Sequence, residues 1–264
     1  MKEFKLYDWK LYSDNYLDKK LVDINDKEDL ERIYKDCKGT NFEVRTDLFP
    51  EPHIGDIQNA KVILLALNPG VKFDNETHKI KELDWYNDNP KVTNILKENL
   101  KGNIKEYYYL NDDINPNNLS PGHSWIMRRT LTKNKFFNEF QVGNEELSIT
   151  KKRVYKNIAC IQFFPYHSAK FNYVQGEYLK SQIHNFKLLD WAINKNKIIV
   201  CLRSIEYWNT ALQFIKSKNK LSTYSNLIEL KKDKNEKGSI LTYISKGNLK
   251  NEADFKKIID ALKK

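Results

Sequence analysis

The chain has 264 residues, enough to bury a sizeable core, and its 40% hydrophobic and 12% aromatic content excludes an intrinsically disordered protein. The formal net charge of +10 indicates a polyanionic partner, nucleic acid first, although a general richness in Lys and Asn explains the same charge equally well. The three cysteines are widely separated and match no zinc or iron–sulfur spacing, so we expect no metal, no cofactor and no disulfides.

The amino terminus, Met1-Lys2-Glu3-Phe4, has no apolar signal core, and no apolar run approaches the length of a membrane span. We therefore expect a cytoplasmic protein with no membrane partner. The sequence does not indicate an oligomeric state.

The first 50 residues are polar with scattered aromatic side chains, and we interpret them as a helical extension packed on a single domain that spans residues 1–264. A helix is predicted over residues 26–37, because Asp26 is a suitable cap and three apolar side chains share one face: Leu30, Ile33 and Tyr34. Residues 47–56 then approach the first strong strand as an extended segment interrupted by prolines.

The apolar run over residues 60–67 is short, uninterrupted and rich in branched side chains, which is typical of a strand buried on both faces. Pro69 removes a ladder donor and Gly70 permits unusual backbone conformations, so the strand should end at Asn68. In open α/β sheets ligands bind at the carboxyl ends of strands, which makes Asn68 a candidate site residue. The alternative is that Asn-Pro-Gly is only a tight turn.

The rest of the chain alternates between helical and strand patterns. Pro90 begins a predicted helix over residues 90–100, and residues 101–123 form an irregular excursion. Further helices are predicted over residues 124–140, 178–194, 205–217 and 251–262, and further strands over residues 157–165, 197–203, 226–230 and 239–244. This order predicts an α/β protein, a three-layer α/β/α sandwich around a largely parallel sheet of four or five strands.

Polar side chains follow several of the predicted strands. Because the carboxyl ends of parallel strands lie at one edge of a sheet, these side chains should border one crevice. They are Asn68, Gln162, His167, Ser245 and Asn248.

The Asn-Pro-Gly strand end follows a Gly-Asp-x-x-x-Ala-Lys approach formed by Gly55, Asp56, Ala60 and Lys61. This pattern resembles the first motif of the uracil-DNA glycosylase superfamily, and is most similar to its mismatch-specific and single-strand-selective branch. The strand before Pro165 resembles the base-reading strand of that family, and residues 245–249 occupy the place of its second motif. In order of elements the resemblance spans roughly residues 47–262.

The resemblance implies a DNA glycosylase that flips a base out of the DNA and cleaves its N-glycosidic bond. Asn68 would position the attacking water, and Phe73 would stack on the flipped base. Gln162 would read the edge of the base, with Asn157 as the other candidate for this role.

The same resemblance implies contacts with DNA from the loop that contains Ser245, Lys246 and Asn248, while Leu249 would wedge into the gap left by the flipped base. Arg128 and Arg129 either clamp a phosphate or form an ordinary solvated pair.

The sequence also departs from the family. Its second motif commonly has a His-Pro-Ser or Asn-Pro-Ser core, whereas this chain has Ser245-Lys246-Gly247-Asn248. His167 either replaces the missing histidine from the neighbouring strand or is a packed loop histidine. Gln162 in place of Asn lengthens the reading arm, which leaves open whether the base is uracil or a modified or differently shaped base.

Two other functions remain open from the sequence. One is a non-catalytic nucleic-acid-binding protein of the same fold, in phage defence or a mobile element. The other is a small-molecule α/β enzyme. The chain has no Gly-rich phosphate loop, which argues against nucleotide hydrolysis and against a dinucleotide cofactor.

Overall fold

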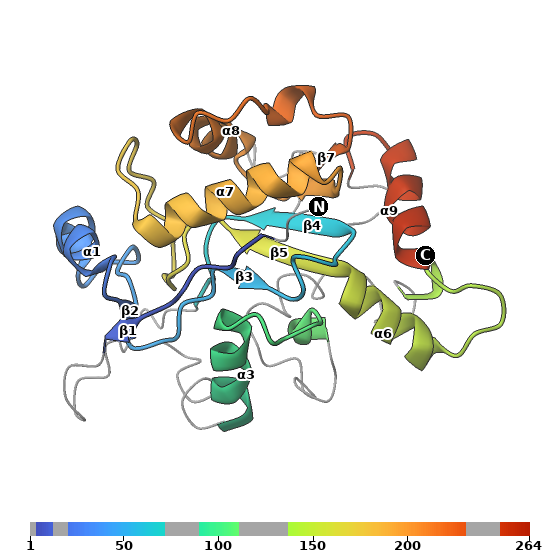
Figure 1. The fold of residues 1–264 in the computed structure, drawn as a ribbon, viewed down its shortest axis with the longest axis horizontal. Helices are drawn as coiled ribbons and strands as arrows, with labels where there is room; N and C mark the ends of the chain where they lie inside the picture. The colour runs from blue at the N-terminus through green and yellow to red at the C-terminus, as the bar shows by residue number, and fades with distance from the viewer. Residues whose placement is uncertain (1–3, 13–20, 72–89, 111–136, 231–248) are drawn as a thin grey trace.

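A five-stranded sheet forms the centre of the computed structural model, which describes residues 4–12, 21–71, 90–110, 137–230 and 249–264 (Figure 1). The strand order is β3-β5-β4-β6-β7. The strands are β3 (His53–Ile54), β4 (Val62–Ala66), β5 (Ile158–Gln162), β6 (Ile198–Cys201) and β7 (Leu227–Glu229). Strands β5, β4, β6 and β7 are parallel to one another, and the edge strand β3 is antiparallel to β5. The predicted fold class is therefore confirmed, with five strands.

Every residue of β4 and β5 is buried, which explains why both sequences are apolar throughout rather than alternating. Alternate side chains enter two separate cores. Val62, Leu64 and Cys160 lie in the core on one face, called the first face here, and Ile63 and Ile161 lie in the core on the second face.

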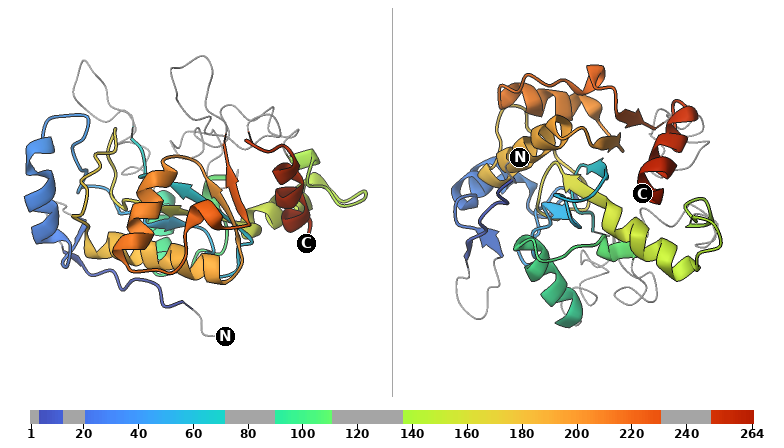
Figure 2. Two further views of the ribbon diagram at one scale, coloured as in Figure 1. Left: turned by 90° about the horizontal axis from the view of Figure 1, so that it is seen from above. Right: turned by 45° about the vertical axis from the view of Figure 1, so that its right-hand side comes forward.

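Helices cover both faces of the sheet and complete the three layers (Figures 1 and 2). The first face packs against side chains of α3 (Pro90–Leu100), α6 (Leu147–Asn157) and α9 (Ala253–Lys263). The second face packs against α7 (Lys180–Asn194) and α8 (Ile205–Phe214). In the described parts of the chain, no helix has the length and apolar character needed to cross a membrane.

The amino-terminal extension is only partly helical. Its described part contains β1 (Leu11–Tyr12) paired antiparallel with β2 (Val22–Asp23), then α1 (Lys27–Tyr34) and the 3-10 helix η1 (Lys35–Cys37). A later 3-10 helix, η2 (Tyr108–Leu110), follows α3, and η3 (Leu221–Thr223) precedes β7.

Asp26 does not cap α1 through its side chain, contrary to the prediction. Its carboxylate instead accepts a hydrogen bond from the Ser181 backbone nitrogen (3.1 Å) in the first turn of α7, and another from the Tyr166 hydroxyl (2.9 Å). The Ser181 hydroxyl also donates to this carboxylate. Asp26 therefore caps a helix that is distant in sequence, and it ties the extension to α7.

Helix α6 and strand β3 were not predicted, and neither were the β1–β2 pair and the 3-10 helices η2 and η3. Helix α6 was missed because its buried side chains, Thr150, Val154 and Tyr155, are mixed with lysines and asparagine. Strand β3 has only two residues and depends on its pairing with β5. Residues 124–136 of a predicted helix and the whole predicted strand 239–244 lie outside the described residues.

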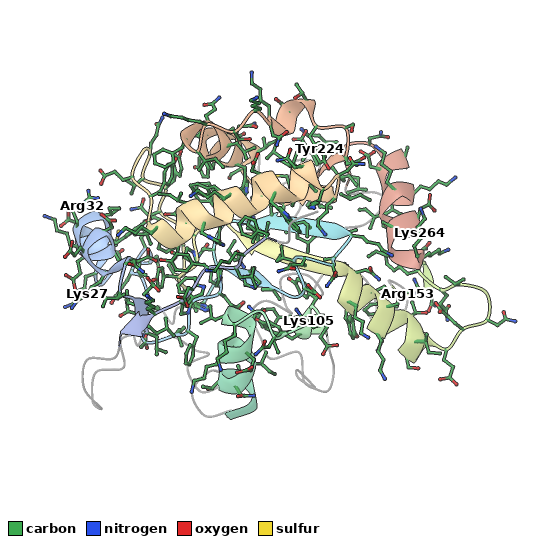
Figure 3. The ribbon with its side chains drawn as sticks, in the orientation of Figure 1. Lys27, Arg32, Lys105, Arg153, Tyr224 and Lys264 are labelled. Carbon is green, nitrogen blue, oxygen red and sulfur yellow. The ribbon has the colours of Figure 1, made fainter. Side chains whose placement is uncertain are left out.

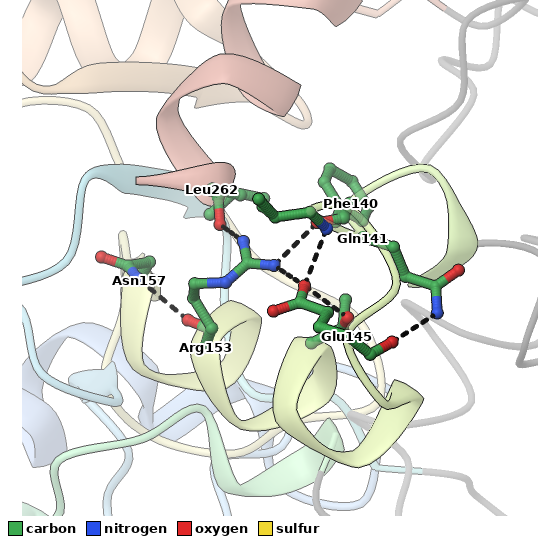
Figure 4. A network of polar contacts seen from close by, with 8 residues as sticks. Phe140, Gln141, Glu145, Arg153, Asn157 and Leu262 are labelled. Atoms are coloured by element: carbon green, nitrogen blue, oxygen red, sulfur yellow. Dashed lines mark hydrogen bonds and ion pairs between the residues drawn. The ribbon is translucent and has the colours of Figure 1, made fainter.

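Arg153 of α6 connects three segments of the first-face layer (Figure 4). Its guanidinium donates to the carbonyl of Phe140 (2.8 Å), to the carbonyl of Leu262 in the last turn of α9, and to the carboxylate of Glu145. The Arg153 and Glu145 side chains are each only 17% exposed. Since Leu262 is in the last turn of α9, Arg153 satisfies a carbonyl that the helix leaves unpaired.

Loss of this guanidinium should weaken the fold. We expect Arg153→Met to lower the free energy of unfolding by about 2 kcal/mol, because it removes a charged donor from the carbonyls of Phe140 and Leu262. It also removes the cation beside the Glu145 carboxylate, which keeps its bonds from Val142 and Thr150. Lys152→Met, an exposed neighbour on α6, should change it by less than about 0.5 kcal/mol. Urea unfolding of both variants measures the difference, and equal stabilities would contradict a stabilising role for Arg153.

Candidate functional site

The carboxyl ends of β4 and β5 continue side by side beyond the strands themselves. The backbone nitrogens of Phe163 and Phe164 donate to the carbonyls of Ala66 (2.8 Å) and Leu67 (2.7 Å). Gly70 and Ser168 then form a further parallel bridge. The Asn-Pro-Gly segment therefore lies directly beside the loop that follows β5.

Asn68 is partly exposed at this edge, and its side-chain orientation is fixed by Ser168. Its Nδ2 donates to the Ser168 carbonyl (3.0 Å), to the Ser168 hydroxyl oxygen (2.9 Å) and to the Pro69 carbonyl (3.2 Å). A carbonyl can only accept, so the amide nitrogen must face Ser168 and the amide oxygen must face away. In the described part of the chain, no group donates to Oδ1. Asn68 thus offers a free acceptor at the edge of the sheet.

Gln162 is the last residue of β5 and pairs with Ala66 of β4. Cys160, two residues earlier on β5, is in the first-face core, so the Gln162 side chain projects from the same face. Asn68 lies just beyond Ala66, the residue of β4 that pairs with Gln162. Gln162 is only 5% exposed, and its Oε1 is buried without a hydrogen-bond donor. Among the described residues, none accepts from its Nε2. An unpaired buried acceptor costs about 1–3 kcal/mol, which makes Oε1 of Gln162 a candidate for binding a ligand.

His167 is fully buried in the same loop. Its Nε2 lies 3.1 Å from the Phe49 carbonyl and 3.9 Å from a Glu51 carboxylate oxygen. Burial lowers the pKa of His167 to about 4, so the imidazole is neutral at physiological pH. This is the placement of a packed loop histidine, the alternative that the sequence left open.

Glu51 was not singled out from the sequence, yet it is the most unusual carboxylate at this edge. It is 1% exposed, and burial raises its pKa to about 7. The Tyr109 hydroxyl donates to its Oε2 (2.5 Å), while its Oε1 is buried without a donor. The sequence signal for Glu51 is its position between two prolines in an extended segment that leads into the central strand.

Asn157, the other candidate for reading the base, lies at the opposite edge of the sheet. It is the last residue of α6, and its Nδ2 donates to the Arg153 carbonyl (2.9 Å). The length of β5 separates it from the Gln162 position by roughly 16 Å. Gln162 therefore lies beside the end of β4 that leads into Asn68, and Asn157 lies at the other end of β5.

Leu249 was predicted to be an exposed wedge, but its burial is at odds with that role. The residue is fully buried in the first-face core and forms an antiparallel bridge with Leu230. A buried side chain cannot insert between bases unless it first leaves the core. The other predicted site residues, Phe73, Arg128, Arg129, Ser245, Lys246 and Asn248, lie outside the described residues.

Cysteines and acidic residues do not form a cluster suited to metal in the part of the chain that the structure describes. There, no group of three or more His, Cys, Asp or Glu side chains is arranged to hold a metal ion. Cys37, Cys160 and Cys201 are all buried and unpaired in disulfides, and burial raises the pKa of the Cys201 thiol to about 12.

The positive charge is distributed over several elements. Figure 3 labels Lys27 and Arg32 on α1, Lys105 after α3, Arg153 on α6 and Lys264 after α9. These cations do not share one element, so the net charge of +10 alone does not locate a binding surface.

Comparisons of the chain with models of known protein families, with curated proteins and with solved structures found no match. The residues at the carboxyl edge of the sheet and their geometry are therefore the basis for the function proposed below.

Ionisation of Glu51 should destabilise the folded protein. Its pKa is about 7 in the fold and 4.5 as an ordinary carboxyl, so between these pH values the unfolded chain loses the proton while the folded chain keeps it. The free energy of unfolding should then fall by up to about 3 kcal/mol as pH rises through this window. We expect Glu51→Gln to match the wild type near pH 5 and to be more stable at pH 8. Urea unfolding at both values tests this, and a pH-independent difference would contradict it.

Proposed function

We propose that this protein is a DNA glycosylase-like hydrolase that cleaves the N-glycosidic bond of a nucleotide flipped out of DNA. The observation that carries the proposal is the Asn68 side chain, whose nitrogen is held by Ser168 while its oxygen stays open at the carboxyl edge of the sheet. Such an amide can accept a hydrogen bond from a water molecule and hold it in one orientation.

The chemistry requires little basicity from Asn68. As the bond between the sugar and the base breaks, its electron pair leaves with the base and positive charge develops on the sugar. The water oxygen then bonds to C1′ of the sugar and releases a proton to solvent, and the departing base takes up a proton. Asn68 orients the water without removing its proton in advance, which suits an electron-poor sugar carbon.

Gln162 supports the same proposal as a group that recognises the base. Its amide offers both donor and acceptor atoms, and it pairs with Ala66 of the adjacent strand, two residues before Asn68. A polyanionic partner agrees with the net charge of +10. The alternative that the sequence left open, a non-catalytic nucleic-acid-binding protein of this fold, shares this charge but has no need of an oriented amide.

Removal of the Asn68 amide should abolish most base release. We expect the purified protein to create alkali-labile strand breaks in oligonucleotides that contain uracil or other altered bases. Asn68→Ala should slow this by about a hundredfold or more, since the water loses its orienting acceptor. Asn138→Ala, at an exposed position, is the matched control and should retain full activity.

Three outcomes separate the candidate functions. Strand breaks that depend on Asn68 support the glycosylase. Salt-sensitive DNA retention without abasic product, unchanged by Asn68→Ala, would identify the non-catalytic binder instead. If the protein neither retains DNA nor produces strand breaks, the small-molecule enzyme becomes the remaining candidate.

Ser168 should affect the rate through Asn68 alone. We expect Ser168→Ala to reduce kcat about five- to tenfold, because one hydrogen bond of about 1 kcal/mol is lost while the Ser168 carbonyl still accepts from Asn68. Single-turnover kinetics measure this, with Ser148→Ala at an exposed position as the control. If Ser168→Ala were as inactive as Asn68→Ala, Ser168 would have a direct part in the chemistry.

A further inference from the structure

Two buried acceptor oxygens without donors belong to two segments that pair at the carboxyl end of β5. They are Oε1 of Glu51 and Oε1 of Gln162. The Gln162 backbone nitrogen donates to the Pro52 carbonyl (2.9 Å), so Glu51 immediately precedes the residue that pairs with Gln162. The Glu51 backbone nitrogen donates to the Pro165 carbonyl (2.7 Å), which fixes the segment against the loop after β5.

Both side chains belong to the first face of the sheet. Cys160 is in the first-face core and precedes Gln162 by two residues on β5, hence its side chain projects from the same face. Tyr109, which donates to Glu51, is in the same core.

The hydroxyls of Tyr108 and Tyr109 are the hydrogen-bonding groups that lower the pKa of Glu51, and neither of them donates to its Oε1. The Tyr109 hydroxyl donates to the other oxygen of Glu51, and the His167 ring nitrogen lies within hydrogen-bond distance of the Phe49 carbonyl. The Gln162 carbonyl accepts from Asn185 Nδ2 (2.8 Å), so only the side chain of Gln162 remains unpaired. This part of the site is therefore rich in acceptors and needs a ligand that brings N–H donors.

We propose, on the basis of the glycosylase function above, that Glu51 and Gln162 form a recognition pair that selects a base with an amino group on its pairing edge. Cytosine, its C5-modified forms and adenine belong to this class. The amino group would donate to the free oxygen of Glu51, and the adjacent ring nitrogen would accept from Nε2 of Gln162.

The corresponding oxo bases fit this pair less well. Uracil places its single N–H between two carbonyl oxygens, and hypoxanthine has a carbonyl where adenine has its amino group. Each carbonyl would direct lone pairs towards an acceptor oxygen that cannot move into water, which is unfavourable in a buried site. The carboxylate therefore discriminates by repelling the oxo base as well as by attracting the amino base.

The test compares bases that differ only in this group. Four oligothymidylates each carry one test nucleotide, and they form two comparisons: dC against dU, and dA against dI. Each is incubated with the protein at pH 8, above the pKa of Glu51. Alkali-labile breaks report base release. We expect release of the amino base to exceed that of its oxo partner at least about tenfold in each pair, the discrimination typical of one good pair of base contacts.

Glu51→Gln provides the decisive comparison, because an amide can turn its NH₂ towards a carbonyl. It should shift the preference towards dU and dI, whereas Glu98→Gln, an ordinary surface carboxylate of α3, should leave the ratio unchanged. Equal or faster release of the oxo base by the wild type would overturn the recognition pair and leave the glycosylase proposal intact. An unchanged ratio in Glu51→Gln would likewise overturn the role of Glu51.

A second measurement applies if no test base is released, which would count against the glycosylase proposal itself. Thermal unfolding is then followed with free deoxycytidine and free deoxyuridine. Greater stabilisation by deoxycytidine, lost in Glu51→Gln, supports the recognition pair without catalysis. Equal effects of the two nucleosides would overturn it.

Discussion

The contact between Asn68 and Ser168 is the interaction on which the rest of the site depends. Pro69 has no backbone N–H, so it cannot donate a hydrogen bond to the loop that follows β5. The Asn68 side chain donates to the Ser168 carbonyl from this same turn, and so supplies a bond across the end of the sheet. A bond that stabilises the end of the sheet thereby turns the amide oxygen outwards. The same hydrogen bond between Asn68 and Ser168 therefore supports the end of the sheet and orients the amide for the proposed chemistry.

Most of the sheet could be predicted because its strands are buried on both faces. The apolar runs that contain β4, β5 and β6 stand out without any tertiary information, and so does the short strand β7. The end of β5 was harder to place. Pro165 marks where the ladder must stop, but it does not say where pairing with β4 ends, so Asn157 stayed a second candidate beside Gln162 until the register was known.

The candidate site was only partly predictable for a related reason. Asn68 could be predicted as a site residue from a local pattern, an apolar strand ended by Pro-Gly. Glu51 could not, because a single carboxylate in a polar stretch normally lies in water. Its burial depends on aromatic side chains far along the chain. Leu249 shows the converse. Its polar sequence neighbours indicated an exposed loop, yet its bridge with Leu230 places it in the core.

The carboxylate of Asp26 has a consequence for the carboxyl edge of the sheet. It binds the start of α7 and also the hydroxyl of Tyr166, which is followed directly by His167 and by the serine that holds Asn68. Residues 21–26 therefore help to support the loop after β5 from behind. Trimming the amino-terminal segment to obtain a shorter protein would remove this support, and the first change would be expected in the orientation of the amide rather than in the sheet.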